Sequence, residues 1–543
     1  MKSKMHISIV LVVSIMLVIA GVANASSSEI PWADRPTSLP DYIGVPAKAH
    51  PSPNSRVPQN PYLAPNPFNM VHMDPWNSDV VDIPGPLGRD PFLFSSTLAD
   101  ARQNPGSKMF ECVGLAFTSH GRLIVSCFGV DEASIALINP ETLDVYDTYP
   151  LGVTLPEDVG GDPQRSALTN GLSASYWFFD KDERFGVSVK GNKIIILVEG
   201  GSEANPTLEL DQEYDVSPWI PAGNRIAGLA MDWQGRIWFY LSGSSATTTS
   251  PEMPGAVYVL DPAKYAAYVL DPAKYSDEPP VKFHKFHQDE QIRNSLAITT
   301  NGVYIVTTKK MYRLGLDPDG ELQIVWEEGY QNAGYTKPGQ YNAGSGATPT
   351  ILGNGKYVAI TDNADPHMQV VVYRTDERLD PNEKRIVCEV PVFEYAKGGA
   401  LDNSLLGSGL SLIAENNYGY QFDFKTLAVT DSEPGFERID INPNGKGCTK
   451  VWANKEIAST ASAKLSTRTG LIYTYARKYD DQNGVWVYYW TALDFRTGKT
   501  VWQKMAGTGH TKFDTIWPAV FVGPNETLYV GLLGGLAAIR DTR

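Results

Sequence analysis

The chain has 543 residues, a net charge of −15, 42% hydrophobic residues and 20% charged residues. This length can bury a large core, which excludes a mainly disordered chain. The acidic balance excludes a broad nucleic-acid or anionic-membrane surface, because both require clustered Lys and Arg. An aromatic content of 11% with few charges is typical of β-rich exported proteins.

Residues 1–25 are predicted to form a secretory signal peptide. Lys2 and Lys4 precede an apolar run over 7–22, and Ala23-Asn24-Ala25 provides an A-x-A cleavage site. The alternative is a transmembrane anchor, but the run is shorter than the roughly 20 residues that a span requires. We therefore expect a secreted or periplasmic monomer that has no membrane span after cleavage.

Residues 26–91 are rich in proline and carry few strand patterns. This composition predicts an extended strap over the rest of the protein, or in part a flexible linker. Residues 92–97 then form a β-rich stretch that lies apart from the later repeats.

From about residue 110 a β-hairpin pattern recurs. Each copy has an apolar stretch, a Gly or Asn turn and a second β-rich stretch, and several copies continue into a third and a fourth strand. The copies begin at Gly114, Ser175, Gly228, Ser295, Thr348, Leu405, Ala463 and Pro518. Units of about 54 residues predict an all-β, eight-bladed β-propeller of four-stranded antiparallel blades over 92–543. The final unit lacks a strand, which we expect 92–97 to supply; two β-sandwiches would not explain the regular copies.

A short duplication interrupts the repeat. The sequence YVLDPAKY occurs at 258–265 and again at 268–275. We interpret the second copy as a local insertion in one outer strand, absorbed at a loop.

Four cysteines follow the signal peptide, an even number suited to an oxidising compartment. Cys112 and Cys127 flank a predicted hairpin turn almost symmetrically, so they are expected to pair. Cys388 and Cys448 would then form the second disulfide. The alternative is four buried free thiols.

The stretch Ala492-Leu-Asp-Phe-Arg-Thr-Gly-Lys-Thr-Val-Trp502 resembles the A-x-D-x-x-T-G-x-x-x-W repeat of quinoprotein alcohol dehydrogenases. In that family the repeat docks a Trp between neighbouring blades of an eight-bladed ring. The family's enzymes bind pyrroloquinoline quinone and calcium beside two adjacent cysteines. This chain has no Cys-Cys pair, so the resemblance implies the fold and argues against a bound quinone.

A second resemblance is to gluconolactonase- and paraoxonase-like propellers, which hold a divalent metal in the channel with Glu, Asn and Asp. Arg293-Asn-Ser-Leu-Ala297 is similar to their N-G-L-A motif, and Asp402-Asn-Ser-Leu405 is a looser copy. Glu111 likewise opens the first inner strand. This resemblance implies metal-assisted chemistry in the channel.

Propeller geometry predicts where a site lies. Loops that lead into the innermost strands, and loops that join the second strand of a blade to the third, share one face around the channel mouth. The predicted metal ligands are Glu111, Asn294, Asn403 and Glu415; the predicted ligand-binding residues are Asn363, Asp365, Asn416, Asn417, Tyr418 and Arg477. Asp362 is a candidate catalytic residue, with His367 or His510 as general base. Such oxygens suit Ca²⁺, although Asn, Asp and Glu are also ordinary turn-capping residues.

Three functions are compatible with these patterns. The leading hypothesis is recognition of a small molecule or saccharide at the channel mouth, with metal-assisted hydrolysis of an ester or lactone. The second is a quinoprotein-like oxidoreductase. The third is a non-enzymatic scaffold that binds proteins or glycans.

Overall fold

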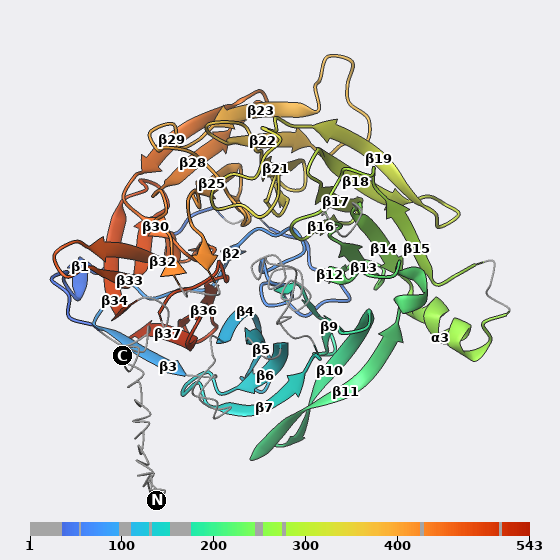
Figure 1. The fold of residues 1–543 in the computed structure, drawn as a ribbon, viewed down its shortest axis with the longest axis horizontal. Helices are drawn as coiled ribbons and strands as arrows, with labels where there is room; N and C mark the ends of the chain where they lie inside the picture. Colours follow the sequence, from blue (N-terminus) through green and yellow to red (C-terminus); the bar gives the residue numbers. More distant parts are fainter. Residues whose placement is uncertain are drawn as a thin grey trace, which may run out of the picture.

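The computed structural model describes residues 35–53, 56–96, 110–129, 133–152, 175–244, 253–273, 278–423, 428–509 and 513–542. The predicted signal peptide lies outside these ranges. Eight antiparallel blade sheets follow one another around a central axis (Figure 1). The predicted all-β, eight-bladed propeller is therefore confirmed. Within the described ranges, no helix has the length and apolar character needed to cross a membrane.

Each blade runs from an inner strand at the channel to an outer strand at the rim. The strands of blades 1 to 7 pair in chain order, whereas the outer strand of blade 8 is the N-terminal β3. Blades 1 to 4 consist of β4 (Phe110–Phe117), β5 (Leu123–Gly129), β6 (Ala133–Ile138) and β7 (Val145–Pro150); β8 (Phe178–Phe179), β9 (Phe185–Val189), β10 (Lys193–Ser202) and β11 (Asn205–Asp215); β12 (Ile226–Met231), β13 (Ile237–Leu241), β14 (Ala256–Leu260) and β15 (Val281–Lys285); and β16 (Ala297–Thr299), β17 (Gly302–Val306), β18 (Lys310–Leu316) and β19 (Leu322–Gly329).

Blades 5 to 8 consist of β20 (Thr350–Leu352), β21 (Tyr357–Thr361), β22 (Gln369–Arg374) and β23 (Ile386–Pro391); β24 (Leu406–Ser408), β25 (Ser411–Glu415), β28 (Phe436–Ile441) and β29 (Cys448–Asn454); β31 (Lys464–Ser466), β32 (Leu471–Asp480), β33 (Val485–Asp494) and β34 (Thr500–Thr508); and β35 (Phe521–Val522), β36 (Leu528–Leu532), β37 (Gly535–Asp541) and β3 (Pro91–Ser96). A hairpin of β26 (Phe422–Asp423) and β27 (Ala428–Val429) extends from blade 6, and β30 (Ala458–Ser459) pairs with β32. A 3₁₀ turn (Ser217–Trp219) follows blade 2.

The N-terminal strand β3 closes the ring, as predicted. It pairs antiparallel with β37 from Pro91↔Asp541 to Ser96↔Leu536, and so becomes the outer strand of blade 8. The Asp541 carboxylate accepts hydrogen bonds from the backbone N–H groups of Leu87, Gly88 and Arg89 at 2.8–3.0 Å. These bonds hold the chain just before β3 against the end of the last strand.

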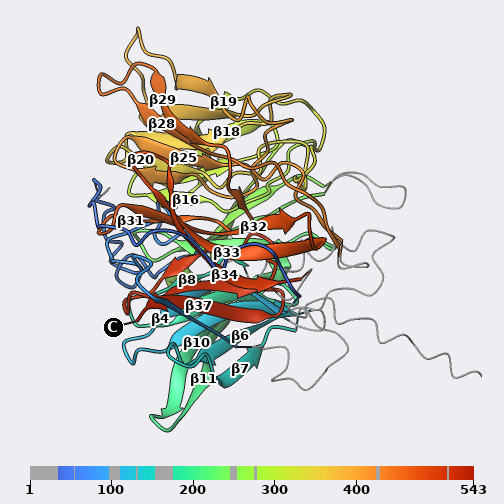
Figure 2. The same ribbon diagram turned by 90° about the vertical axis from the view of Figure 1, so that its left-hand side faces the viewer.

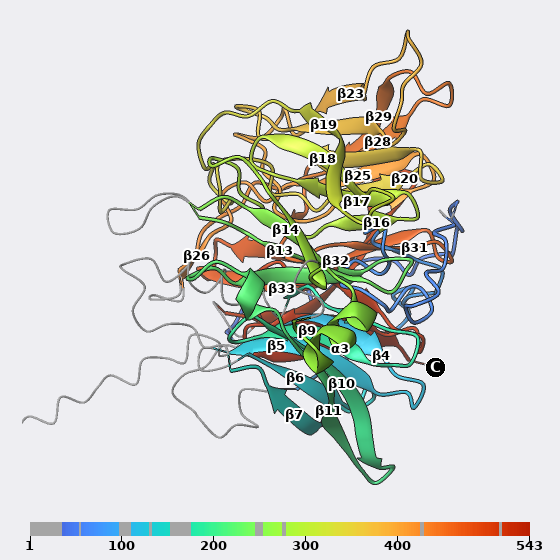
Figure 3. The ribbon, with the colours of Figure 1, turned by 90° about the vertical axis from the view of Figure 1, so that its right-hand side faces the viewer.

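The segment before β3 lies along one face of the ring (Figures 2 and 3, blue). At one end β1 (Tyr42–Gly44) pairs with the outer strand β34, and at the other β2 (Val80–Val81) pairs in parallel with the inner strand β31. Between them, backbone carbonyls accept hydrogen bonds from the inner strands of blades 2, 4, 5, 6 and 7. The carbonyl of Asn69 accepts from Phe179, that of Pro75 from Ile298, that of Trp76 from Ile351, that of Ser78 from Gly407 and that of Asp79 from Leu465. We call residues 56–83 the strap; it crosses the centre of the ring (Figure 1).

Tryptophans of outer strands dock on turns of the next blade. Trp452 of β29 donates from Nε1 to the Phe495 carbonyl at 3.0 Å, in the turn that follows β33. Trp326 of β19 donates to the Thr375 carbonyl of blade 5 at 3.4 Å. Trp502 of β34 is fully buried and packs against Gly88, immediately before the closing strand. These contacts tie neighbouring blades together.

Both predicted disulfides are confirmed. Cys112 and Cys127 face each other on β4 and β5. Cys388 of β23 and Cys448 of β29 join blades 5 and 6. The second bond therefore supplements the packing between two blades.

The duplicated sequence adopts two structures. In the first copy, Tyr258-Val-Leu260 is buried in β14 between two neighbouring strands. In the second, the same three residues end the helix α3 (Pro262–Leu270), where Val269 and Leu270 are 57% and 87% exposed. Asp261 caps this helix by accepting hydrogen bonds from Ala263 N and Lys264 N. The insertion thus forms a surface helix beside blade 3.

Candidate functional site in the central channel

Loops that lead into the inner strands of blades 4 to 6 meet at the channel. The Asn294 side chain donates to the backbone carbonyls of Gly346 and Asp402, the latter at 2.7 Å, and accepts from the Tyr176 hydroxyl at 2.7 Å. Gly346 is required by this approach, because a Cβ there would overlap Asp402 Oδ1. Arg293 Nε lies 3.6 Å from Asp402 Oδ2, and burial raises the pKa of Asp402 to about 6 despite this ion pair.

Two of the four predicted metal ligands are in direct contact. Asn403 Nδ2 donates to Glu415 Oε1 at 2.8 Å. Glu415 is only 3% exposed, and burial raises the pKa of its carboxyl to about 7, against the lowering effects of Asn403 and of the Lys464 charge. Glu415 Oε2 is buried without a hydrogen-bond partner in the described part of the chain. The Ser459 hydroxyl lies close to the same carboxylate and also lowers its pKa.

The two asparagines that follow Glu415 differ in whether their side chains are hydrogen bonded. Asn416 Oδ1 accepts from Ala400 N and Tyr418 N, and its Nδ2 donates to the Gly398 carbonyl, so this side chain shapes the loop. Asn417 is fully buried, yet neither its amide oxygen nor its amide nitrogen has a hydrogen-bond partner among the described residues. The Tyr418 ring packs closely on Gly398.

The cluster 362–367 joins the second and third strands of blade 5. The Asp362 carboxylate accepts from the backbone of Ala364 and Gln369 and from the Gln369 side chain, and burial raises the pKa of this carboxyl to about 6. Asn363 donates to Asn332 Oδ1 and the Tyr335 carbonyl, and the exposed Asp365 accepts from the Tyr335 hydroxyl at 2.7 Å.

These bonds tie the cluster 362–367 to the neighbouring blade 4 loop. His367 is half-buried, and its Nδ1 has no hydrogen-bond partner in the described ranges.

Arg477 belongs to a separate buried cluster. Its Nη1 lies 3.4 Å from Asp514 Oδ2, and its guanidinium stacks over the rings of Tyr420 and Trp486 at 4.6 and 4.2 Å from their centroids. Burial raises the pKa of Asp514, although the Arg477 charge lowers it. This cluster joins blades 6, 7 and 8 through charge and aromatic packing.

Two predicted residues lie wholly or partly outside the described residues. His510 lies outside the described residues. The Glu111 backbone pairs with Phe128 in blade 1, but its side chain lies outside the description. Among the described residues, no group of three or more His, Cys, Asp and Glu side chains could hold a metal ion. The calcium site remains a prediction.

The sequence reasoning missed a second polar group, which the strap brings into the channel. His72 Nδ1 lies 3.2 Å from both Asp79 carboxylate oxygens and 3.0 Å from Ser404 Oγ. Lys464 Nζ of blade 7 lies 2.5 Å from Asp79 Oδ1, and Ser404 donates to Asp79 Oδ2. All four residues are buried. Ser404 immediately follows Asn403, so this group adjoins the Asn403–Glu415 pair.

The neighbouring positive charges control the protonation state of the Asp79 carboxyl group. Burial alone would raise the pKa of this carboxyl, but Lys464 and His72 outweigh burial and lower it. Asp79 is therefore a buried carboxylate anion. The only sequence signal for this group was the dense polar run His72-Met-Asp-Pro-Trp-Asn-Ser-Asp79 within the proline-rich segment.

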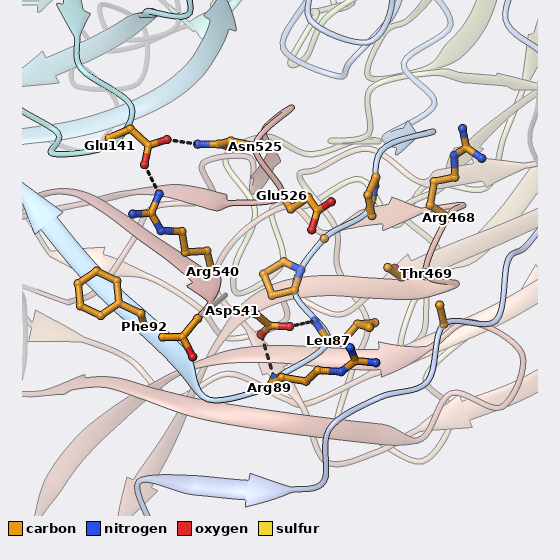
Figure 4. Close-up of a pocket in the computed structure, with 15 residues that line it drawn as sticks. Leu87, Arg89, Phe92, Glu141, Arg468, Thr469, Asn525, Glu526, Arg540 and Asp541 are labelled. Carbon is orange, nitrogen blue, oxygen red and sulfur yellow. Dashed lines mark hydrogen bonds and ion pairs between the residues drawn. The ribbon is translucent and has the colours of Figure 1, made fainter.

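Two grooves lie outside the clusters around Asn294, Glu415 and Arg477, and the second is lined in part by Asp74 and Ser78, which lie between His72 and Asp79 in the chain. A groove of about 760 Å³ follows the ring closure, where Arg540 pairs with Glu141 and Asn525 donates to the same carboxylate at 3.0 Å (Figure 4). A second groove of about 620 Å³ lies between the strap and blade 1, with Phe68 and Phe117 on its wall. Neither groove includes a predicted site residue.

No family model matches the chain, and no curated protein matches it. Among solved structures, Sqt1 from Chaetomium thermophilum is 9% identical over 91% of this chain and 100% of its own, with a TM-score of 0.42. A protein named as a candidate 6-phosphogluconolactonase from Bacteroides fragilis is 12% identical over 74% and 99%, with a TM-score of 0.36.

The Dos1 propeller is 11% identical over 79% of each chain, with a TM-score of 0.35. With TM-scores this low, the similarity to these structures says nothing about the function of this chain. The fold assignment rests on the sheet topology.

Proposed function

We propose that the central channel binds a small polar molecule, such as a saccharide, beside Glu415, and supports hydrolysis of an ester or lactone. The observation that carries this proposal is a set of buried polar atoms without hydrogen-bond partners in the described chain: Glu415 Oε2, both amide atoms of Asn417, and Asp402 Oδ1. Buried polar atoms are normally paired, and each unpaired one costs about 1–3 kcal/mol. A polar ligand would satisfy these atoms.

Calcium remains part of the proposal. Glu415 Oε2 and the Asn417 amide oxygen are hard oxygen donors without protein hydrogen bonds, which suits Ca²⁺. Asn294 is less suited, because its oxygen already accepts from Tyr176. Glu415 and Asn417 would hold the ion, which when bound would polarise a carbonyl group. The protein residues would supply the binding and orientation of the substrate.

Two further proposals concern the chain as a whole. Export is supported by the predicted signal peptide and by the two disulfides. Kinship with quinoprotein-like propellers is supported by the docking of Trp326, Trp452 and Trp502.

Calorimetric titration with a panel of neutral saccharides and lactones tests the binding proposal. We expect at least one compound to bind wild type, and Glu415→Gln to weaken that binding at least tenfold. Glu437→Gln is the matched control: Glu437 is equally buried in blade 6, but it accepts from Phe393 N and lies near Lys450. Calcium should raise the Tm of wild type and not that of Glu415→Gln. Equal binding by both variants, or none by wild type, would contradict the proposal.

A further inference from the structure

We infer that the strap completes the channel site and that His72 is its general base. This inference rests on the proposed hydrolysis in the channel and names the group that accepts the proton. Neither the repeat nor the family resemblances point to residue 72, because it lies outside the blades.

The contacts of His72 fix its tautomer. Its Nδ1 faces the carboxylate of Asp79, which is an anion and can only accept, so Nδ1 carries the proton. In the neutral ring, Nε2 then presents a lone pair. Nε2 is buried and has no hydrogen-bond partner within the described ranges, and His72 as a whole is 5% exposed. A buried, oriented imidazole with an unused acceptor nitrogen is suited to proton transfer.

His72 is close to residues of both polar clusters of the channel. Its ring centroid is 6.2 Å from that of Tyr176, whose hydroxyl donates to Asn294. Ser404, next to Asn403 in the chain, contacts both Nδ1 of His72 and the carboxylate of Asp79. The imidazole therefore adjoins the blade 4 cluster as well as the Asn403–Glu415 pair.

The backbone around His72 is held in an unusual conformation. Met73, Asn77 and Asp79 have positive φ angles of 75°, 52° and 55°, and all three are buried. Met rarely adopts this conformation, whereas Asn and Asp tolerate it. Such residues persist where the surroundings impose them, and they cluster at functional sites. The bonds from the strap carbonyls to Ile298, Ile351, Gly407 and Leu465 provide that constraint.

Lys464 and Asp79 have supporting roles. The Lys464 ammonium lies 2.5 Å from Asp79 and keeps that carboxylate ionised in a buried setting. Asp79 in turn orients the ring and would stabilise the imidazolium that forms during the reaction. Asp79 is thus a positioning residue.

In the proposed step, Nε2 of His72 takes a proton from a water molecule while the water oxygen bonds to the carbonyl carbon of the ester or lactone. The C–O bond then breaks, and the imidazolium returns its proton to the departing alkoxide. The products are the acid and the alcohol, joined as a hydroxy acid when the substrate is a lactone. Water is the only co-reactant.

The test compares wild type with His72→Gln in the hydrolysis of 4-nitrophenyl acetate and δ-valerolactone. We expect kcat to fall at least 100-fold, since general base catalysis contributes about 10²–10⁴-fold, while KM and saccharide binding stay within threefold. Asp79→Asn should lower kcat and leave KM within threefold of wild type, because Asp79 orients the imidazole. His284→Gln, on an outer strand of blade 3, is the control that should keep the wild-type rate.

The outcomes separate this inference from the proposed function. A wild-type rate in His72→Gln, with ligand binding intact, overturns the role of His72 alone. A wild-type kcat in Asp79→Asn overturns it too, even if His72→Gln fails to fold, because Asp79 fixes the tautomer of the imidazole. If wild type binds a saccharide but hydrolyses neither probe, the role of His72 as general base is overturned and the binding proposal stands. Absence of both binding and hydrolysis overturns both proposals.

Discussion

At the residue scale, the channel concentrates carboxyl groups whose pKa values are raised by burial. The pKa of Glu415 rises to about 7 and that of Asp402 to about 6, in each case mainly because the group is removed from water. Both residues also carry an oxygen without a hydrogen-bond partner in the described chain. Such groups are poised to exchange protons or to bind a cation near neutral pH.

Replacing Glu415 should therefore change how stability depends on pH. Because the folded state binds this proton more tightly than the unfolded state, wild type loses stability as the pH rises from about 4.5 to about 7. At about 1.4 kcal/mol per pKa unit, the loss reaches about 3 kcal/mol at most. Glu415→Gln removes this loss, so its Tm relative to wild type should be higher at pH 8 than at pH 4.5. A pH-independent difference in calorimetric Tm would contradict the assignment.

The residues of the site differ in how far the sequence could predict them. Asn403 and Glu415 were predicted to lie at the channel because the loops that carry them share one face of a propeller. In the structure these two side chains are hydrogen bonded to each other. His72 was missed because its partner Ser404 is 332 positions away in the chain and belongs to another part of the fold. A proline-rich segment gives no periodicity from which such a contact can be derived.

At the element scale, turn chemistry and alternation predicted the blades, because these depend on local patterns that recur. The closing strand followed from the strand that the last unit lacks, and the Cys388–Cys448 pair from the pairing of the other two cysteines. The duplicated YVLDPAKY shows where local patterns fail. The same three residues are strand at Tyr258 and helix at Tyr268, because only the first copy lies between two partner strands. Tertiary contacts decide between the two structures.

The docking of Trp452 can be tested through Gly498. This glycine has φ 69°, and a Cβ there would overlap the Trp452 ring. Gly498→Ala should cost about 1–2 kcal/mol for the left-handed backbone and about 1–3 kcal/mol more for the displaced ring.

The matched control for Gly498→Ala is Gly484→Ala in the β32–β33 turn. There φ is 64°, and the nearest atom, the Tyr479 hydroxyl, would be 3.7 Å away. Equal shifts in the urea midpoint for the two variants would show that the Trp452 contact adds nothing.

At the scale of the whole molecule, the ring depends on contacts between the two ends of the propeller. Strand β3 and the chain before it contact residues about 450 positions later, through β37 and Asp541. The strap makes similarly distant contacts with the inner strands, so one face of the channel and the closure of the ring belong to the same N-terminal segment. Opening the closure should therefore loosen both the ring and the candidate site.

Asp541→Ala should open the ring at this closure. The variant loses the acceptor for Leu87, Gly88 and Arg89, which we expect to lower the unfolding free energy by about 2–4 kcal/mol at roughly 1 kcal/mol per bond. Asp317→Ala is the control, because Asp317 accepts from two N–H groups within one turn of blade 4 and closes no long loop. Limited proteolysis should cleave Asp541→Ala first between the strap and β4, well before Asp317→Ala or wild type. Equal cleavage rates for the two variants would mean that β3–β37 pairing alone holds the ring closed.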